Sequence, residues 1–432
     1  MRLRRLITAV VVGALPLAWA AAAITGEEYA GRRAAVLAAM DSGSVMVLRA
    51  ADLRMRSNDV EYRFRQDNSF LYLTGLSETG LTLLLDPSGV DAGGTRARVL
   101  LFAPPASRER LGAAVGEMAV LDAGRFQEIF RRVLGEKKTL HLSAPDIRFV
   151  NDWVNGKPVF LDRDIRKELE GKHPALKVKN AGAMIGPMRG IKSPAEIALI
   201  REAIRLTGEG LRRAAEVCAP GRYEYELQAE IEYAMLKQGS VGPAFPSIVG
   251  SGPNTLDYHY SANRRQMERG DMVVLDVGAE WEGYSADVTR TYPVSGEFTP
   301  EQRRMYEAVL KAQESVIAVI RPGLAMGELD RVAKETLAAE GFAGYLKHGV
   351  SHHLGLDTHD AGPLDTLRAG MVITVEPGAY VAASDTVLPL AYRGQGIRIE
   401  DDVLVTETGH EVLSAGIPKK PEEVQGMIGK KR

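Results

Sequence analysis

The chain has 432 residues, which is enough for about two or three domains with sizeable cores. A hydrophobic content of 45% and a charged content of 25% are ordinary for a globular protein and exclude extensive disorder. The formal net charge of -2 gives no basic field, so neither a nucleic acid nor an anionic membrane surface is implied as a partner. The single cysteine, Cys218, excludes an intrachain disulfide, and we interpret it as a packed thiol.

The N-terminus carries the features of a cleavable signal peptide over residues 1–23. Arginines at positions 2, 4 and 5 precede an apolar run at 6–23, and small residues near its end allow cleavage after Ala20, Ala22 or Ala23. An uncleaved membrane anchor is the alternative, because the run reaches the spanning threshold of about 18 residues, but Pro16 favours cleavage. We therefore expect an exported protein, periplasmic or secreted, without a stable membrane partner after cleavage.

An α/β domain is expected at residues 24–183. It begins with a helical pattern at 27–40 and a strand at 44–50. Further strands are expected at 70–76, 81–86, 98–103 and 139–143, and helical stretches near 108–118 and 124–134. No catalytic constellation occurs in this half. The segment 62–75 mixes charged and aromatic residues densely, which fits either a subunit contact or the wall of a shared site; the sequence leaves both open.

A second domain is expected at residues 184–432, because the composition turns to Gly, Met and Pro around 181–191. Ser193, Pro194 and Glu196 fit the N-cap, first and third positions of a helix that runs to about Cys218. Helices at 225–237, 300–320 and 326–340 and strands at 272–277, 284–289, 371–381 and 397–406 follow. This half is therefore α+β, with antiparallel strands that carry its polar clusters.

The stretch 272–294 places two aspartates in strands that should be buried. Asp276 lies inside the apolar run 272–277, and a buried, unpaired carboxylate is costly. The chain then turns through Glu282 and Gly283 and returns as a strand that carries Asp287, so the pattern predicts a hairpin. Two carboxylates that meet at ~4 Å repel by about 4 kcal/mol at an effective dielectric near 20. A cation between them would relieve this repulsion, which indicates a metal site.

Further residues with ligand chemistry gather downstream. Half of the eight histidines lie within 348–359, which is typical of a metal or proton-transfer site, although a loop that happens to be histidine-rich is the alternative. Glu376 and Glu400 each follow β-branched residues. Strand alternation places Arg398 and Glu400 on one face and two isoleucines on the other, for which a solvated strand face is the alternative.

Together these carboxylates match the charge of two divalent cations. Asp276, Asp287, Glu376 and Glu400 carry a summed charge of -4, and one imidazole would complete the ligand set. Two ions a few ångströms apart hold a bridging hydroxide at neutral pH and polarise a carbonyl, which suits hydrolysis. Oxygen ligands with one histidine favour Mn²⁺, with Fe²⁺, Co²⁺ or Zn²⁺ as alternatives.

The order of these residues resembles the pita-bread metallopeptidases, and within them the Xaa-Pro aminopeptidase (aminopeptidase P) family. The resemblance is carried in the second half by LDVGAEWEGYSADVTRTYPV, HGVSHHLGLDTHD, TVEPGAY and RIEDDVLVT, and in the first half by YRFRQDNSFLYLTGL and RGIKSPAEIALIREA. It covers nearly the whole mature chain. It implies an α/β N-terminal domain followed by an α+β pita-bread (creatinase/aminopeptidase-like) catalytic domain.

The resemblance also implies residue roles. It implies that two divalent metal ions are bound by Asp276, Asp287, His352, Glu376 and Glu400. It implies that His259 contacts the substrate or steadies charge on the attacked carbonyl, and that His348 and His359 line the pocket and assist proton transfer to the proline nitrogen. Arg398 would orient the metal ligands, and Glu376 would manage the proton of the metal-bridging hydroxide.

The implied reaction is the hydrolysis of peptides between the first residue and a proline at the second position, by a homodimer or homotetramer. A prolidase, which shares the ligands but takes only dipeptides, is one alternative. A catalytically inactive pita-bread protein that binds peptides is another, but such a protein would be expected to lack ligands, and all five are present. The sequence leaves open the native metal, the residue before proline, the physiological peptide and the oligomer count.

Overall fold

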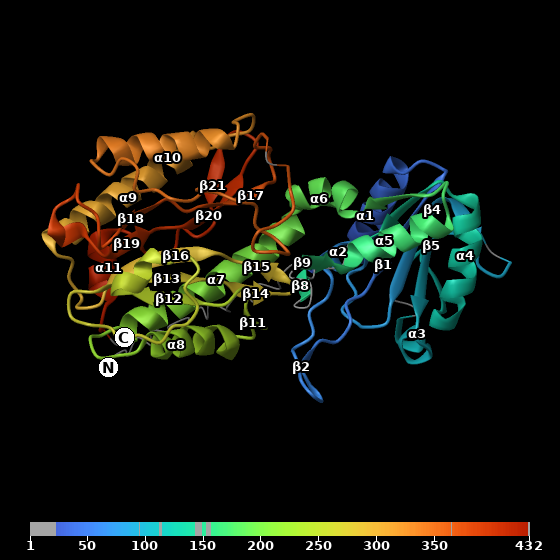
Figure 1. Ribbon diagram of the computed structural model, residues 1–432, viewed down its shortest axis with the longest axis horizontal. Coiled ribbons are helices and arrows are strands. Elements are labelled where there is room, and N and C mark those ends of the chain that lie inside the picture. The colour runs from blue at the N-terminus through green and yellow to red at the C-terminus, as the bar shows by residue number, and fades with distance from the viewer. Residues whose placement is uncertain are drawn as a thin grey trace, which may run out of the picture.

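The computed structural model describes residues 23–94, 96–111, 115–142, 149–152, 157–363 and 365–430. Residues 1–22 of the expected signal peptide lie outside this range. Figure 1 shows two bodies along the long axis of the molecule, an N-terminal domain and a larger C-terminal domain. They are connected through α6 (Gly182–Gly190) and α7 (Pro194–Val217). In the part of the chain that is described, no helix is both long enough and apolar enough to cross a membrane.

A six-stranded mixed sheet forms the centre of the N-terminal domain, in the order β10-β7-β1-β4-β5-β6. β4 runs antiparallel to β1 and β5, and the other pairs are parallel. The strands are β1 (Ser44–Arg49), β4 (Thr82–Asp91), β5 (Arg96–Ala103), β6 (Ala119–Asp122), β7 (Thr139–Leu142) and β10 (Lys177–Asn180). The ribbons β2 (Met55–Ser57) with β3 (Val60–Glu61), and β8 (Phe149–Asp152) with β9 (Lys157–Phe160), lie outside this sheet.

Helices cover both faces of this sheet, which confirms the α/β class. Buried side chains of α1 (Gly26–Ala39), α2 (Asn68–Thr74), α3 (Pro105–Leu111) and α6 pack on one face. Buried side chains of α4 (Phe126–Glu136) pack on the other face, together with the partly buried Leu169 of α5 (Leu161–Lys172). The short helix η1 (Ala123–Arg125) precedes α4. The strands β1, β4 and β5 alternate their side chains between these two cores, as central strands buried on both faces require.

The strand expected at 70–76 is wrong, because residues Asn68–Thr74 form helix α2. The aromatic and aliphatic composition favoured a strand, but local capping decides the structure. The Asp67 side chain accepts a hydrogen bond from the backbone N–H of Phe70, and Gly75 ends the helix in the left-handed region, at φ 69°. Asp67 and Gly75 are the residues in the sequence from which a short helix could have been predicted.

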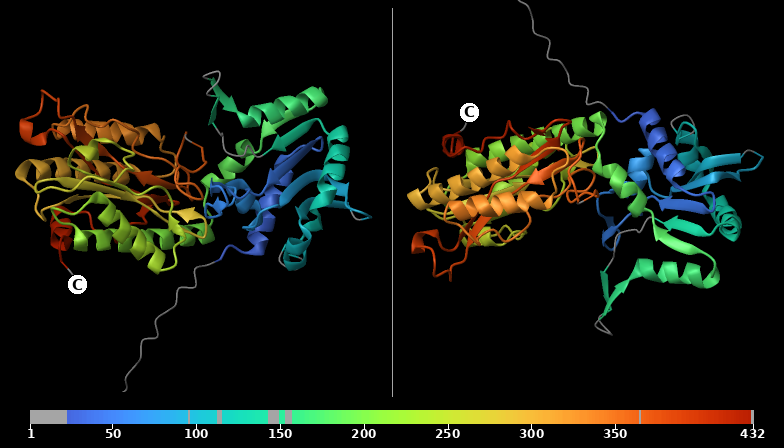
Figure 2. Two further views of the ribbon diagram at one scale, coloured as in Figure 1. Left: turned by 60° about the horizontal axis from the view of Figure 1, so that its bottom comes forward. Right: turned by 90° about the horizontal axis from the view of Figure 1, so that it is seen from above.

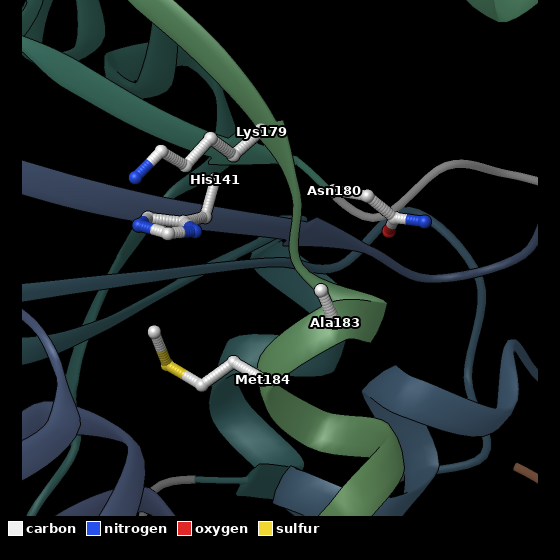
Figure 3. A pocket seen from close by; sticks show the side chains of 5 residues that line it. All are labelled: His141, Lys179, Asn180, Ala183 and Met184. Carbon is white, nitrogen blue, oxygen red and sulfur yellow. The ribbon is translucent and has the colours of Figure 1, made fainter. Parts of the chain in front are cut away.

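The N-terminal domain contains a cavity beside the parallel strands β7 and β10. It has a volume of about 450 Å³ and is lined by His141, Lys179, Asn180, Ala183 and Met184 (Figure 3). His141 and Lys179 are register partners on neighbouring strands, so their side chains lie on the same face of the sheet. None of the expected metal ligands lines this cavity, which belongs to the N-terminal domain.

The C-terminal domain consists of two halves, each with a pair of packed helices over antiparallel strands. In the first half, α7 packs with α8 (Glu224–Lys237) against β12 (Ile248–Ser251), β13 (Met272–Val277) and β16 (Val288–Pro293). In the second, α9 (Pro300–Val319) packs with α10 (Gly327–Ala339) against β17 (Val372–Val375), β18 (Gly378–Val381), β19 (Gln395–Arg398) and β20 (Asp401–Val405). Figure 1 shows these helix pairs on opposite sides of the strands. This arrangement is the expected α+β pita-bread domain.

Shorter elements complete the C-terminal domain. They are β11 (Gly242–Pro243), η2 (Gly252–Leu256), β14 (Ala279–Trp281), β15 (Tyr284–Ser285), η3 (Leu390–Tyr392), β21 (His410–Val412) and α11 (Pro421–Met427). The capping box predicted at the start of α7 is present, because Ser193 and Glu196 bond each other's backbone N–H. Cys218 follows this helix and is buried, as expected.

Each of the two long strands expected at the end of the chain is broken in two. Residues 371–381 divide into β17 and β18 around Glu376 and Pro377, and residues 397–406 divide into β19 and β20 around Ile399 and Glu400. β17 pairs with β20 and β18 pairs with β19, so the breaks face each other. Proline has no N–H to donate to a ladder, which explains the first break. Both glutamates therefore lie where the two ribbons change direction.

A buried polar cluster joins the two domains. The guanidinium of Arg32 in α1 lies 3.2 Å from the carboxylate of Glu196 in α7, and it donates to the Tyr72 carbonyl oxygen. Tyr284 in β15 donates its hydroxyl to the same glutamate at 2.8 Å. These groups come from both domains and are partners of one another, so the cluster helps to fix how the domains meet.

Candidate metal centre

The hairpin expected at 272–294 is present, and it brings the two aspartates to one face. In the β13–β16 ladder Asp276 lies opposite Thr289, and Asp287 precedes that threonine by two positions, so all three side chains share a face. The turn at Glu282 and Gly283 has positive φ at both residues, as a two-residue hairpin turn requires. A side chain at Gly278 would meet the Ala286 carbonyl oxygen at 1.7 Å, so the two arms approach too closely for any residue but glycine.

Ligand atoms from three separate segments meet at this face. One atom each of Asp287, His352 and Glu400 lies within 4.8 Å of the others. The His352 Nε2 atom is 3.6 Å from Asp287 Oδ2 and 3.5 Å from Glu376 Oε1. Asp276 joins the group from the opposite strand, since its charge acts on Asp287 and Glu400. The structure therefore brings together all five residues expected as metal ligands.

The orientation of His352 suits metal binding through Nε2. Its Nδ1 atom lies 3.1 Å from the carbonyl oxygen of His353, so Nδ1 carries the proton and Nε2 directs its lone pair at the carboxylates. His353 points elsewhere. Its Nε2 lies 2.8 Å from the Pro363 carbonyl oxygen, and the residue is buried. The neighbouring histidines thus have different surroundings, and only His352 faces the cluster.

The cluster is electrostatically strained when no cation is present. Burial, together with the charges of Glu400 and Asp276, holds the pKa of Asp287 well above its usual range. Burial and the charges of Glu376 and Asp276 do the same to the pKa of Glu400. Burial also raises the pKa of Glu376 to about 8. The buried Oδ1 atoms of Asp276 and Asp287 have no hydrogen-bond partner.

Arg398 connects the carboxylates to the rest of the domain. It donates to Asp276 Oδ2 at 2.6 Å, to the Tyr380 hydroxyl at 2.9 Å and to Thr289 Oγ1 at 3.2 Å. Thr289 in turn donates its hydroxyl to Glu400 Oε2 at 2.6 Å. One guanidinium therefore holds both sides of the carboxylate cluster in place, as expected of a group that orients ligands.

His348 is held at the edge of the cluster by a tyrosine. The Tyr380 hydroxyl lies 2.8 Å from His348 Nε2, and Nδ1 of the same ring lies 2.8 Å from the Gly349 carbonyl oxygen. Since Nδ1 must donate to that carbonyl, Nε2 accepts from the tyrosine and the ring is neutral. Burial lowers the pKa of His348, in agreement with this assignment. Its Nδ1 atom is 3.7 Å from Glu376 Oε2.

The other two expected histidines are His359 and His259. The His359 ring stacks on the His352 ring, with centroids 3.9 Å apart. Burial is the main cause that lowers the pKa of His359, and the charge of His259 lowers it further. His259 is exposed and is positioned through its backbone N–H, which donates to Asp257 Oδ1. All expected site residues thus lie in or around one carboxylate cluster.

Sequence reasoning did not find Thr289 or Tyr380, although both contact Arg398 directly. Thr289 could have been found from strand alternation, because it lies two positions after Asp287 on a predicted strand. Tyr380 depends on the pairing of β18 with β19, in which Gly378 lies opposite Arg398. No local pattern in the sequence indicates that register.

The residues fit divalent cations. Two buried carboxylate oxygens have no hydrogen-bond partner, and the neighbouring His352 imidazole has a free lone pair. Such donors are typical of sites that bind hard to borderline metal ions. Bound cations would also remove the repulsion that raises the carboxyl pKa values, because a nearby positive charge favours the ionised form. The donor set is rich in oxygen and contains no thiolate, which disfavours a soft ion.

Comparison with known proteins agrees with this geometry. Residues 198–407 match the model of metallopeptidase family M24, and residues 29–112 match the N-terminal domain of aminopeptidase P. The chain is 36% identical over 440 residues to the Xaa-Pro aminopeptidase of Escherichia coli strain K12, covering 94% of this chain and 98% of the relative. The chain belongs to the Xaa-Pro aminopeptidase family within M24. As a member of it, the protein is a metal-dependent aminopeptidase.

Solved structures support membership of the Xaa-Pro aminopeptidase family at the level of the fold. Pseudomonas aeruginosa aminopeptidase PepP superimposes with a TM-score of 0.80 at 30% identity, covering 94% of this chain and 98% of that one. Zinc-substituted E. coli aminopeptidase P in complex with product gives a TM-score of 0.78 at 33% identity, with coverage of 95% and 100%. The Xaa-Pro aminopeptidase family thus accounts for both domains of this chain.

Proposed function

We propose that this protein removes the first residue from peptides that have proline at the second position, using two divalent cations. The observation that carries the proposal is the convergence of Asp287, His352 and Glu400 within 4.8 Å, next to Asp276 and Glu376. The Xaa-Pro aminopeptidase names of the relatives support the same substrate class.

The ions would be held by Asp276, Asp287, His352, Glu376 and Glu400, and Mn²⁺ is the proposed metal because the donors are mostly carboxylates. When bound, two such cations lower the pKa of a coordinated water and polarise the scissile carbonyl. Glu376 is placed to hold the proton of the attacking water, since its carboxylate faces both His348 and His352.

The histidines outside the ligand set would act on the substrate. A proline nitrogen in a peptide bond has no proton, so its departure requires that a proton be delivered to it. His359 stacks on the ligand His352, and both His359 and His259 are exposed, which supports a role for both rings in contacting the peptide. Burial lowers the pKa of His348, the Tyr380 hydroxyl contacts its Nε2 atom, and the ring would line the pocket on the Glu376 side.

Substrate length separates this proposal from a prolidase. Both reactions break the same bond, so specificity must come from the region beyond proline, where a dipeptide ends in a carboxylate and a longer peptide continues. We expect Ala-Pro-Ala to be cut with a higher kcat/KM than Ala-Pro, and Ala-Ala-Ala to be a poor substrate, in assays with Mn²⁺. A clear preference for the dipeptide would make the protein a prolidase. Binding of these peptides without cleavage of any would indicate a peptide-binding protein.

We also propose that the chain is exported to the periplasm or the outside of the cell, on the basis of the arginines and the apolar run within residues 1–23. Protein from the native host should begin between Ala21 and Ile24 when its N-terminus is determined by mass spectrometry. An intact Met1 on cytosolic protein would be the contrary result. A homodimer or homotetramer stays a prediction. Light scattering of the purified protein would measure the oligomeric state.

A further inference from the structure

Residues 353–360 form a loop, here named the His359 loop, whose first and last residues are joined by a backbone hydrogen bond. The backbone N–H of Asp360 donates to the His353 carbonyl oxygen at 2.8 Å. The Asp360 carboxylate contacts Arg189 and lies 3.1 Å from Lys192 Nζ. The C-terminal domain adds two backbone bonds, from Ser285 N to the Gly355 oxygen and from Leu354 N to the Val372 oxygen. These contacts fix the ends of the loop.

The middle of the His359 loop is held from the N-terminal domain. Arg65 Nη2 donates to the Leu356 carbonyl oxygen at 2.5 Å, and Asn68 Nδ2 donates to the same oxygen at 3.2 Å. The other nitrogens of Arg65 are also used: Nε donates to Glu280 Oε2 at 2.7 Å and Nη1 donates to Asn68 Oδ1 at 2.8 Å. One planar guanidinium thus joins the N-terminal segment, strand β14 and the loop, a geometry that a lysine cannot reproduce.

Apolar packing accompanies these hydrogen bonds. A side chain at Gly283 would meet Leu71 Cδ2 at 3.0 Å and Leu356 Cδ2 at 3.5 Å, so helix α2 and the His359 loop both pack against the β14–β15 turn. Figures 1 and 2 show α2 at the junction of the two domains, beside β14 and β15. The segment 62–75, which is rich in charged and aromatic residues, therefore contacts the C-terminal domain of its own chain. The sequence had left open whether it forms a subunit contact or the wall of a shared site.

We propose that Arg65, assisted by Asn68, is a positioning residue through which the N-terminal domain holds His359 against His352. His359 follows Leu356 by three residues, and its ring stacks on the ligand ring at 3.9 Å between centroids. Without the two donors the Leu356 carbonyl would lose its fixed place, and the middle of the loop would keep the contact between the Asp357 carboxylate and Arg189 Nη2 at 2.7 Å, in addition to the anchors at its ends. The kinetic part of this inference rests on the proposed function.

The experiment compares Arg65→Gln with Arg65→Lys and with the control Arg63→Gln. Arg63 crosses the same domain boundary, but its Nη1 contacts the Val241 carbonyl oxygen and not the His359 loop. We expect Arg65→Gln to lower kcat on Ala-Pro-Ala by about tenfold with KM changed less than about twofold, because a small displacement of a reacting group costs rate more than binding. Arg65→Lys should recover only part of the loss, and Arg63→Gln should match the wild type.

A second measurement does not depend on any substrate. Hydrogen–deuterium exchange of Mn²⁺-loaded protein should be about threefold or more faster over residues 353–360 in Arg65→Gln, and unchanged there in Arg63→Gln. If the wild type cuts no Xaa-Pro peptide but this difference is seen, the proposed function fails and the positioning role stands. Unchanged exchange of the loop, or equal kinetic losses in Arg65→Gln and Arg63→Gln, would overturn the positioning role.

Discussion

Asp287→Asn is expected to give a folded protein that binds less than its full complement of metal and has no measurable aminopeptidase activity. Asp287 is almost fully buried, one of its carboxylate oxygens has no protein partner, and the other lies 3.6 Å from His352 Nε2. An amide of the same shape removes the charge and one donor oxygen while it fills the same space. Metal analysis of wild-type protein at saturation should give about two ions per chain, and the variant should give fewer.

The matched control for this change is Asp365→Asn, because Asp365 is a surface carboxylate whose partner Arg368 is also exposed. It should keep wild-type activity and metal content. Full activity of Asp287→Asn after metal removal would refute the assignment of the metal centre.

The same variant should be more stable than the wild type when both are metal-free. In the metal-free wild type the pKa of Asp287 and that of Glu400 are raised by burial and neighbouring carboxylates, and that of Glu376 is raised to about 8. Between their ordinary values near 4 and these raised values the folded state binds more protons than the unfolded state, so stability falls as pH rises. The unfolding temperature of metal-free wild type should therefore drop from pH 5 to 8, and metal should abolish this trend.

Arg290→Met is expected to destabilise the protein by about 3–5 kcal/mol, because it leaves a buried aspartate without its main partner. Arg290 is fully buried and donates to Asp401 Oδ1 at 2.8 Å and to the backbone oxygens of Glu400, Ile417 and Pro418. Burial alone would raise the pKa of Asp401, but the charges of Arg290 and Lys419 hold it below its ordinary value.

The loss should appear as a large fall in the unfolding temperature of the metal-loaded protein. Arg331→Met is the control, since Arg331 pairs with glutamates on an exposed helix face, where ion pairs contribute little. Equal unfolding temperatures for Arg290→Met and the wild type would show that the Asp401 carboxylate finds sufficient partners in Lys419, Gln313 and Ser414.

Local patterns in the sequence predicted those parts of the fold that local chemistry decides. The 272–294 hairpin was predictable because the apolar run at 272–277 and the Glu282-Gly283 turn agree, and the start of α7 was predictable from its capping box. Helix α2 was missed because composition was weighed above the cap at Asp67. The breaks at Glu376 and Glu400 were missed because each depends on a partner ribbon far away in the chain.

The candidate site, like the fold, could be predicted from the sequence only in part. The carboxylate ligands could be named from residue type and order, and Arg398 from the family resemblance, but the contacts that hold these residues in place could not be predicted. Thr289 and Arg398 act across strands 109 positions apart, and Arg65 acts across 291 positions. Such contacts depend on tertiary packing, which no pattern within a single window of sequence contains.

The division of the carboxylate cluster between the two halves of the C-terminal domain also bears on how the chain folds. Thr289 and Glu400 are hydrogen-bonded across 111 positions, and closing a loop of that length costs entropy before any contact compensates for it. Each half can bury its own helices and strands first, whereas the cluster forms only when the halves dock. We therefore expect cations bound by residues of both halves to hold the docked halves together and to slow unfolding of the native chain.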